Sequence, residues 1–77
     1  MSRKWNGQAL KQAREGLAIS QHALAVLSGA QDNQIGQWER GVAPGSANLV
    51  NLLDGLNIAC KRAGVPRVKI TDLMVIE

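Results

Sequence analysis

The chain has 77 residues, enough for a single small domain spanning 1–77, and its one cysteine excludes an intramolecular disulfide. Two tryptophans are its only aromatic residues, which disfavours a β-rich domain, and no apolar run approaches the roughly 20 residues of a membrane span. The formal net charge of +3 is compatible with a nucleic-acid partner but does not require one.

A first helix is predicted over residues 7–17. Asn6 precedes it and is a good N-cap, because its side-chain oxygen can accept a hydrogen bond from a backbone N–H of the first turn. Leu10, Ala13 and Leu17 fall at i, i+3 and i+7, so they form a single apolar stripe. This pattern indicates a helix that packs one face against a core.

A second helix is predicted over residues 20–28. Ser20 is its expected cap, and Ala23, Leu24 and Leu27 form its apolar stripe. Gly29 follows directly, and glycine reaches positive φ without steric cost. The sequence therefore predicts a tight turn at this position.

Residues 31–40 predict a third helix with two unlike faces. Ile35 and Trp38, at i and i+3, give it an apolar face. Asn33, Gln37 and Arg40, at i, i+4 and i+7, give it a polar face. A helix of this kind is anchored on one side and free to contact a partner on the other.

A fourth helix is predicted over residues 46–63, after a loop at 42–45. Ser46 is the expected cap, and Gly64 and Pro66 mark a firm stop. Gly55 and Asn57 leave an earlier end of the helix open. Helical spacing nevertheless continues throughout, in Leu49, Leu52, Leu53, Leu56, Ala59, Cys60 and Ala63.

The tail, residues 65–77, fits either a strand or a short helix. Val68 and Ile70 alternate as in a strand, whereas Thr71 is a suitable cap for a short helix. The tail carries much apolar surface for so small a chain, so we expect it to form a two-fold dimer interface with the end of the fourth helix. The alternative is that it closes the core of the monomer. The residues concerned are Val68, Ile70, Leu73, Met74, Val75 and Ile76.

Residues 20–41 have the spacing of a helix-turn-helix. This motif needs a small residue inside its first helix, a turn residue that tolerates positive φ, and apolar residues that wedge the second helix in place. Counting from Gln21 as the first position, Ala25 is fifth, Gly29 ninth, Ile35 fifteenth and Trp38 eighteenth. Four matches at fixed offsets, between an amphipathic helix and a Leu-rich one, make a strong signal.

Residues 10–56 resemble the Xre/Cro family of phage and bacterial repressors. The resemblance implies an all-α fold, a compact lambda-repressor-like bundle of about five helices, which binds double-stranded operator DNA and usually forms a homodimer. The matching residues are Leu10-Lys11-Gln12-Ala13-Arg14, Ile19-Ser20-Gln21, Ala25, Gly29, Ile35-Gly36-Gln37-Trp38-Glu39-Arg40-Gly41, Pro44 and Asn48-Leu49 through Leu56.

The resemblance also implies roles for individual residues. The third helix would lie in the major groove and read bases through Gln31, Asp32, Asn33 and Gln37. Asn and Gln amides suit this role because they pair bidentately with adenine. Phosphate contacts would come from Gln21 and Arg40. Gln34 either touches DNA or faces solvent, and Gln31 either reads bases or is only a cap or turn residue. Gly36 would let the major groove of the DNA come close to the helix backbone. Arg14 and Glu39 match a structural ion pair that ties the first helix to the third.

Two features depart from the family pattern. Asp32 places a negative charge at the start of the reading helix, where it either accepts a hydrogen bond from cytosine or favours the positive end of the helix dipole. The motif also has almost no positive charge, although phosphate neutralisation supplies most non-specific affinity for DNA. We therefore expect the flanking residues Arg3, Lys4 and Lys11 to contact phosphates as well, with Lys61 and Arg62 as further candidates.

The sequence gives no reason to expect an enzyme. Metal-ligand spacings, phosphate-binding glycine loops and nucleophile motifs are missing, so no cofactor, metal or small-molecule substrate is expected. His22 has no clustered ligand or acid around it and reads as a surface residue. The leading hypothesis is a cytoplasmic transcriptional regulator, a repressor of phage or bacterial type on a palindromic operator. The alternative is a protein-interaction module, such as an antitoxin, anti-repressor or adaptor, that uses the same fold.

Overall fold

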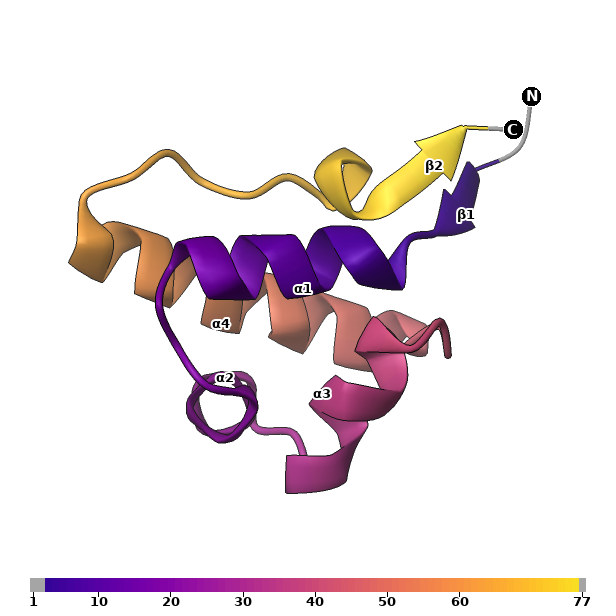
Figure 1. Cartoon of the computed structure of the whole chain (residues 1–77), viewed down its shortest axis with the longest axis horizontal. Helices are drawn as coiled ribbons and strands as arrows, with labels where there is room; N and C mark the ends of the chain where they lie inside the picture. The colour runs from indigo at the N-terminus through magenta and orange to yellow at the C-terminus, as the bar shows by residue number, and fades with distance from the viewer. Residues whose placement is uncertain (1–2, 77) are drawn as a thin grey trace.

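The computed structural model describes residues 3–76, which form four α-helices, one 3-10 turn and a two-stranded sheet (Figure 1). Glu77, the last residue of the predicted tail, lies outside the described residues. The elements in chain order are β1 (Arg3–Trp5), α1 (Gly7–Gly16), α2 (Gln21–Ser28), α3 (Asp32–Glu39), α4 (Ser46–Ala63), the 3-10 turn η1 (Ile70–Leu73) and β2 (Met74–Ile76).

The helices begin and end where local chemistry satisfies their backbone groups. The Asn6 side chain accepts a hydrogen bond of 3.2 Å from the Ala9 N–H, and the Ser20 hydroxyl accepts one of 3.0 Å from the Ala23 N–H. Gly29, with φ of 66°, ends α2 in the left-handed conformation that the sequence predicts. The start of α1, the cap of α2 and the end of α2 are confirmed, and α2 begins at Gln21, directly after the predicted cap Ser20.

The predicted bounds of α4 are confirmed, but its predicted cap is wrong. Ser46 is the first residue of the helix, and Gly45 occupies the N-cap position without a side-chain hydrogen bond. Gly64, with φ of 70°, ends the helix, and neither Gly55 nor Asn57 interrupts it. Leucines on both sides of Gly55 are buried, and their packing outweighs the cost of about 1 kcal/mol for glycine inside a helix.

The tail is both a turn and a strand. Residues 70–73 form η1, and β2 then pairs antiparallel with β1, with Trp5 opposite Met74 and Arg3 opposite Ile76. The bundle expected to hold about five helices therefore has four α-helices, and its fifth helical element is a single 3-10 turn. No sequence pattern predicted β1, because its pairing partner lies at the other end of the chain.

The core lies between α1, α2, α3 and α4, and η1 covers one side of it. Its largest fully buried side chains are Leu10, Leu24, Ile35, Leu52, Leu56, Leu73 and Cys60. In Figure 1, α1 and α4 run along the length of the molecule, while α2 is seen end-on below them. Each buried leucine or isoleucine stabilises the fold by about 1.5–3 kcal/mol relative to an exposed one.

Burial divides the residues expected to form a dimer interface. Leu73 is fully buried in the core of the monomer, so its assignment to an interface is wrong. Val68 packs against the core, and its backbone N–H and C=O both bond the Asn57 side chain, at 2.7 and 3.2 Å. Ile70, Val75 and Ile76 stay exposed, at 44%, 42% and 62% of their surface. Leu73 and Val68 thus follow the alternative interpretation, in which the tail closes the core.

No helix among the described residues has the length and apolar character needed to cross a bilayer.

Candidate nucleic-acid interface

The orientation of α3 is set by its apolar face. Ile35 is fully buried and Trp38 is 4% exposed, so both are fixed in the core. The Trp38 carbonyl also accepts a hydrogen bond of 2.8 Å from the Trp5 indole N–H, which ties the end of α3 to the N-terminal strand. With this side anchored, the start of α3 faces solvent. Its exposed residues there are Gln31, Asp32 and Asn33.

A polar network joins α1, α2 and α3. The Arg14 guanidinium donates two hydrogen bonds to the Glu39 carboxylate, from Nε at 2.6 Å and from Nη2 at 3.2 Å, and a third of 2.9 Å to the Ile19 carbonyl. Gln21 adds a bond of 3.1 Å from its amide nitrogen to Glu39. The Arg14 and Glu39 side chains, which the resemblance pairs, are only 12% and 5% exposed. This network holds the first turn of α2 against the end of α3.

The same network sets the charge state of its members. Burial raises the pKa of Glu39, but hydrogen bonds from Arg14 and Gln21, together with the charges of Arg14 and Lys11, lower it by more. The pKa of Glu39 therefore lies below the ordinary glutamate value. The hydrogen bond to Glu39 raises the pKa of Arg14 against the opposing effect of burial. Both groups are charged at neutral pH, so the ion pair is complete there.

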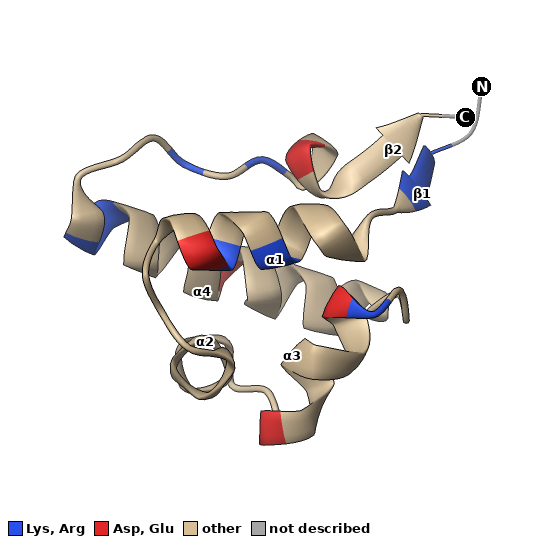
Figure 2. Ribbon diagram, viewed as in Figure 1, with Lys and Arg blue, Asp and Glu red and all other residues tan. Residues whose placement is uncertain are grey.

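A polar groove opens beside this network, between α1, the start of α2 and the end of α3. Three residues of the predicted phosphate set, Lys11, Gln21 and Arg40, meet in its lining. In Figure 2 the basic positions of α1 lie on the ribbon face above α2 and α3. Three basic or amide side chains from three helices can together bind a phosphate oxygen. Gln8 also lines the groove, and sequence reasoning missed it because it precedes the matched residues.

Gly36 does not lie open to solvent, so the expectation that it admits the DNA groove is wrong. The residue is buried. A Cβ atom there would lie 3.3 Å from the Arg40 guanidinium and 3.5 Å from the Gln21 side-chain oxygen. The small residue therefore makes room for these two side chains, which close over it, and brings both to the polar groove.

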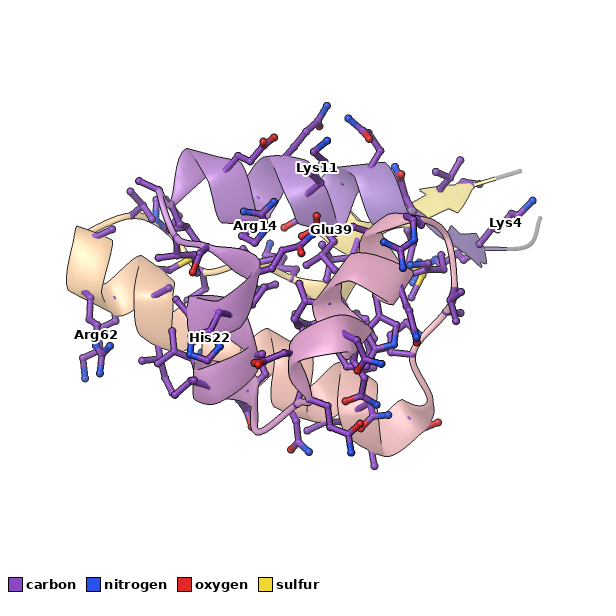
Figure 3. All side chains as sticks on the ribbon, turned by 60° about the horizontal axis from the view of Figure 1, so that its bottom comes forward. Lys4, Lys11, Arg14, His22, Glu39 and Arg62 are labelled. Carbon is purple, nitrogen blue, oxygen red and sulfur yellow. The ribbon has the colours of Figure 1, made fainter. Side chains whose placement is uncertain are left out.

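The four predicted base readers differ in their surroundings. Asn33 is exposed and Gln37 is half-buried, and neither side chain bonds another described residue. Asp32 is joined to α2, because its carboxylate lies 2.8 Å from Nδ1 of His22. Figure 3 shows His22 on the outer side of α2, near the start of α3. Sequence reasoning missed this pairing because the two residues belong to different helices.

Gln31 and Gln34 have local roles at the start of α3. Gln31 is the N-cap residue, and its backbone N–H donates a hydrogen bond of 2.9 Å to the side-chain oxygen of Gln34. The Gln34 oxygen is therefore engaged within the helix. Its amide nitrogen is the part of this side chain that a phosphate, which only accepts hydrogen bonds, can use.

Arg3 and Lys4 lie apart from the groove, on the exposed strand β1. Figure 3 shows Lys4 at one end of the molecule and Arg62, in the last turn of α4, at the other. These basic side chains flank the interface and do not converge on it. Among the described residues there is no cluster of His, Cys, Asp or Glu able to hold a metal ion.

Comparison with known protein families matches residues 10–62 to the family described as Helix-turn-helix, HTH_3. No curated protein and no solved structure matches the chain.

Proposed function

The chain belongs to the Xre/Cro-type helix-turn-helix family, a family of DNA-binding, non-enzymatic domains, and from this membership we propose that it is a sequence-specific transcriptional repressor. It works as a homodimer on a palindromic operator in a bacterial cytoplasm, in a host or phage regulatory circuit. It occludes a promoter without an enzymatic step. The observation that carries this proposal is the exposed polar start of α3, held rigidly by the core and by the Arg14–Glu39 pair.

Base recognition falls to the polar side of α3. Asn33 and Gln37 are suited to adenine, because one amide can both donate to N7 and accept from the N6 amino group. Asp32 can accept a hydrogen bond from the cytosine amino group through the carboxylate oxygen that does not face His22. Each good pairing of this kind discriminates against a wrong base by about 1–3 kcal/mol. Gln31, the N-cap residue of α3, either contacts a base itself or orients the start of the helix in the major groove.

Phosphate contacts come from the polar groove beside α3. Lys11 supplies a charge from α1 and Arg40 one from the end of α3. Gln21 has one amide hydrogen bonded to Glu39, and the other is available to a phosphate oxygen. Arg3, Lys4 and Gln34 add contacts at the margins. The small number of cations implies that non-specific affinity is modest and that specific base contacts matter correspondingly more.

The dimer is formed through the exposed apolar residues of the tail. Ile70, Val75 and Ile76 remain largely uncovered in the monomer, and Met74 is half-buried beside them. A two-fold interface here would bury apolar surface that the monomer leaves in water. It must place the two copies of α3 about 34 Å apart, one turn of DNA.

Selection from a random DNA library at low salt, followed by sequencing, tests this function. We expect recovery of an inverted repeat whose half-sites lie about one helical turn apart. Folded protein that enriches no sequence above background would contradict the proposal.

A second candidate function is the binding of a protein partner. It is favoured by shallow grooves along the outer side of α4 and the segment after it. Val50 and Ile58 on α4 are 59% and 42% exposed there, and Val65, which follows the helix, is 45% exposed. Salt distinguishes the two functions, since a DNA complex with several phosphate contacts weakens steeply as salt rises.

A further inference from the structure

His22 and Asp32 form a bridge between the two helices of the motif. His22 is the second residue of α2 and Asp32 the first of α3. Nδ1 of the imidazole lies 2.8 Å from a carboxylate oxygen, and the two side chains are 71% and 76% exposed. The pair stands beside Gln21 and Asn33, the neighbours in sequence that the proposed function assigns to phosphate and base. Neither side chain packs into the core, so core packing does not explain why the two residues are paired.

The chemistry of the pair determines which imidazole nitrogen is available. A carboxylate only accepts hydrogen bonds, so Nδ1 of His22 carries a proton and donates it to Asp32. This leaves Nε2 on the exposed side of the ring. In the neutral ring Nε2 is an acceptor and cannot bond a phosphate oxygen, which is also an acceptor. In the protonated ring Nε2 becomes a charged donor, which a phosphate accepts strongly.

Protonation also changes the charge that α3 presents to DNA. With a neutral imidazole, Asp32 leaves one uncompensated negative charge at the exposed start of the reading helix. With a protonated imidazole, the pair is neutral overall. Protonation therefore strengthens DNA binding in two ways, because it adds a hydrogen-bond donor for phosphate and removes a charge repulsion.

We propose that His22 is a DNA-backbone contact made in its protonated form, with Asp32 as the residue that positions the ring. The inference rests on the proposed DNA-binding function and adds a regulatory property to it. DNA binding takes up a proton at each protomer, so DNA affinity falls as pH rises. Asp32 thereby acts as a positioning residue as well as a candidate reader.

Other charged groups do not replace Asp32 as the partner of His22. On α3, Glu39 is engaged by Arg14, and Arg40 lines the polar groove. On α4, which packs against α2, Asp54, Lys61 and Arg62 are exposed, and among the described residues no ion pair joins any of them to His22. Exposed pairs of this kind contribute little to stability, so variants at His22 will fold.

The test is the pH dependence of DNA affinity. Fluorescence anisotropy with a labelled mixed-sequence duplex, at constant salt of about 50 mM, gives Kd between about pH 5.5 and pH 8. We expect the Kd of the native chain to rise about tenfold across this range. His22→Gln keeps a donor that does not titrate, and His22 is the only histidine of the chain, so its Kd should stay nearly constant. His22→Lys should bind as tightly at pH 8 as at the acid end.

Asp32→Ala provides the matched test of the positioning residue. It removes both the acceptor for Nδ1 and the negative charge, so DNA binding should be tighter at high pH and should depend less on pH. Equal pH profiles for the native chain and His22→Gln, with DNA bound in both, would overturn this inference and leave the proposed function intact. An absence of DNA binding at every pH would overturn the proposed function, and the proton-linked contact with it.

Discussion

Arg14 is the residue whose loss we expect to affect the whole fold. Arg14→Ala leaves the Glu39 carboxylate, 5% exposed, without its charged partner. Removing one member of a buried pair destabilises a protein by about 3–5 kcal/mol, so the melting temperature in a circular dichroism scan should fall sharply. The double variant Arg14→Met with Glu39→Leu is the control, and it should lose less stability because no charge is stranded. A native melting temperature for Arg14→Ala would contradict the structural role of the pair.

Glu39 gives this pair a defined pH dependence. Its pKa in the folded chain is lowered, so its contribution to stability is present above the ordinary glutamate value of about 4.3 and is lost as pH falls below it. Urea titrations of the native chain and Glu39→Gln, made from about pH 6 to pH 3, measure this contribution. The gap between their free energies of unfolding should shrink towards the acid end. A constant gap would mean that the Glu39 pKa is not lowered by folding.

Gln37 tests whether the polar side of α3 reads bases. Gln37→Ala should relax preference at one base pair of each half-site by about 1–3 kcal/mol, and affinity for unrelated DNA should hardly change. Competition binding with operator variants measures this preference. Gln12→Ala, an exposed glutamine on α1 outside the polar groove, is the matched control. If Gln37→Ala lowers affinity equally for every sequence, Gln37 is not a reader.

At the residue scale, the sequence predicted the roles of several side chains but not the contacts between helices. The family resemblance paired Arg14 with Glu39 and assigned Gln21 and Arg40 to phosphate. The structure places all four side chains around one polar groove. The His22–Asp32 contact could not be predicted, because it depends on the angle between two helices. The burial of Gly36 under two side chains depends on the same angle.

At the scale of elements, the crossing of α2 and α4 depends on Gly55. A Cβ atom at Gly55 would collide with the Ser28 side chain and lie 2.9 Å from the Ser28 backbone nitrogen. Alanine favours a helix over glycine by about 1 kcal/mol, but here the two helices would be forced apart, which costs about 1–3 kcal/mol. We expect Gly55→Ala to lower stability in urea titrations. Gly16→Ala is the matched control, since nothing lies within 4 Å of that position, and it should raise stability. Equal effects of the two substitutions would refute the close crossing.

Helices were more predictable than strands because their signals are local. The span of α4 followed from the repeat of apolar residues and from Gly64 and Pro66, all within the segment itself. By contrast, β1 and β2 are each three residues long and stabilise one another across the length of the chain. Val68 and Ile70 alternate like a strand, yet the strand begins only at Met74, because Asn57 binds Val68 and η1 follows.

At the scale of the whole molecule, different residues of the tail serve the folding of the monomer and the proposed dimer. Leu73 lies in the core, while Val75 and Ile76 are exposed on β2. Leu73→Ala should therefore destabilise the monomer by about 2–5 kcal/mol, whereas Ile76→Glu should leave its stability nearly unchanged. If the proposed dimer uses β2, the native chain should sediment as a dimer at micromolar concentration and Ile76→Glu as a monomer.

The DNA affinity of Ile76→Glu completes this prediction. A dimer binds both half-sites of an inverted repeat together, so a monomeric variant should lose much of its affinity for the full operator. Its affinity for a single half-site should change little, because the polar groove and the reading side of α3 lie outside the substituted strand. Val42→Glu, at an equally exposed valine in the loop after α3, controls for the added charge and should stay dimeric. A native chain that sediments as a monomer and binds half-site and full operator equally well would contradict the dimer. Recognition would then depend on one copy of α3 and on the phosphate contacts around it.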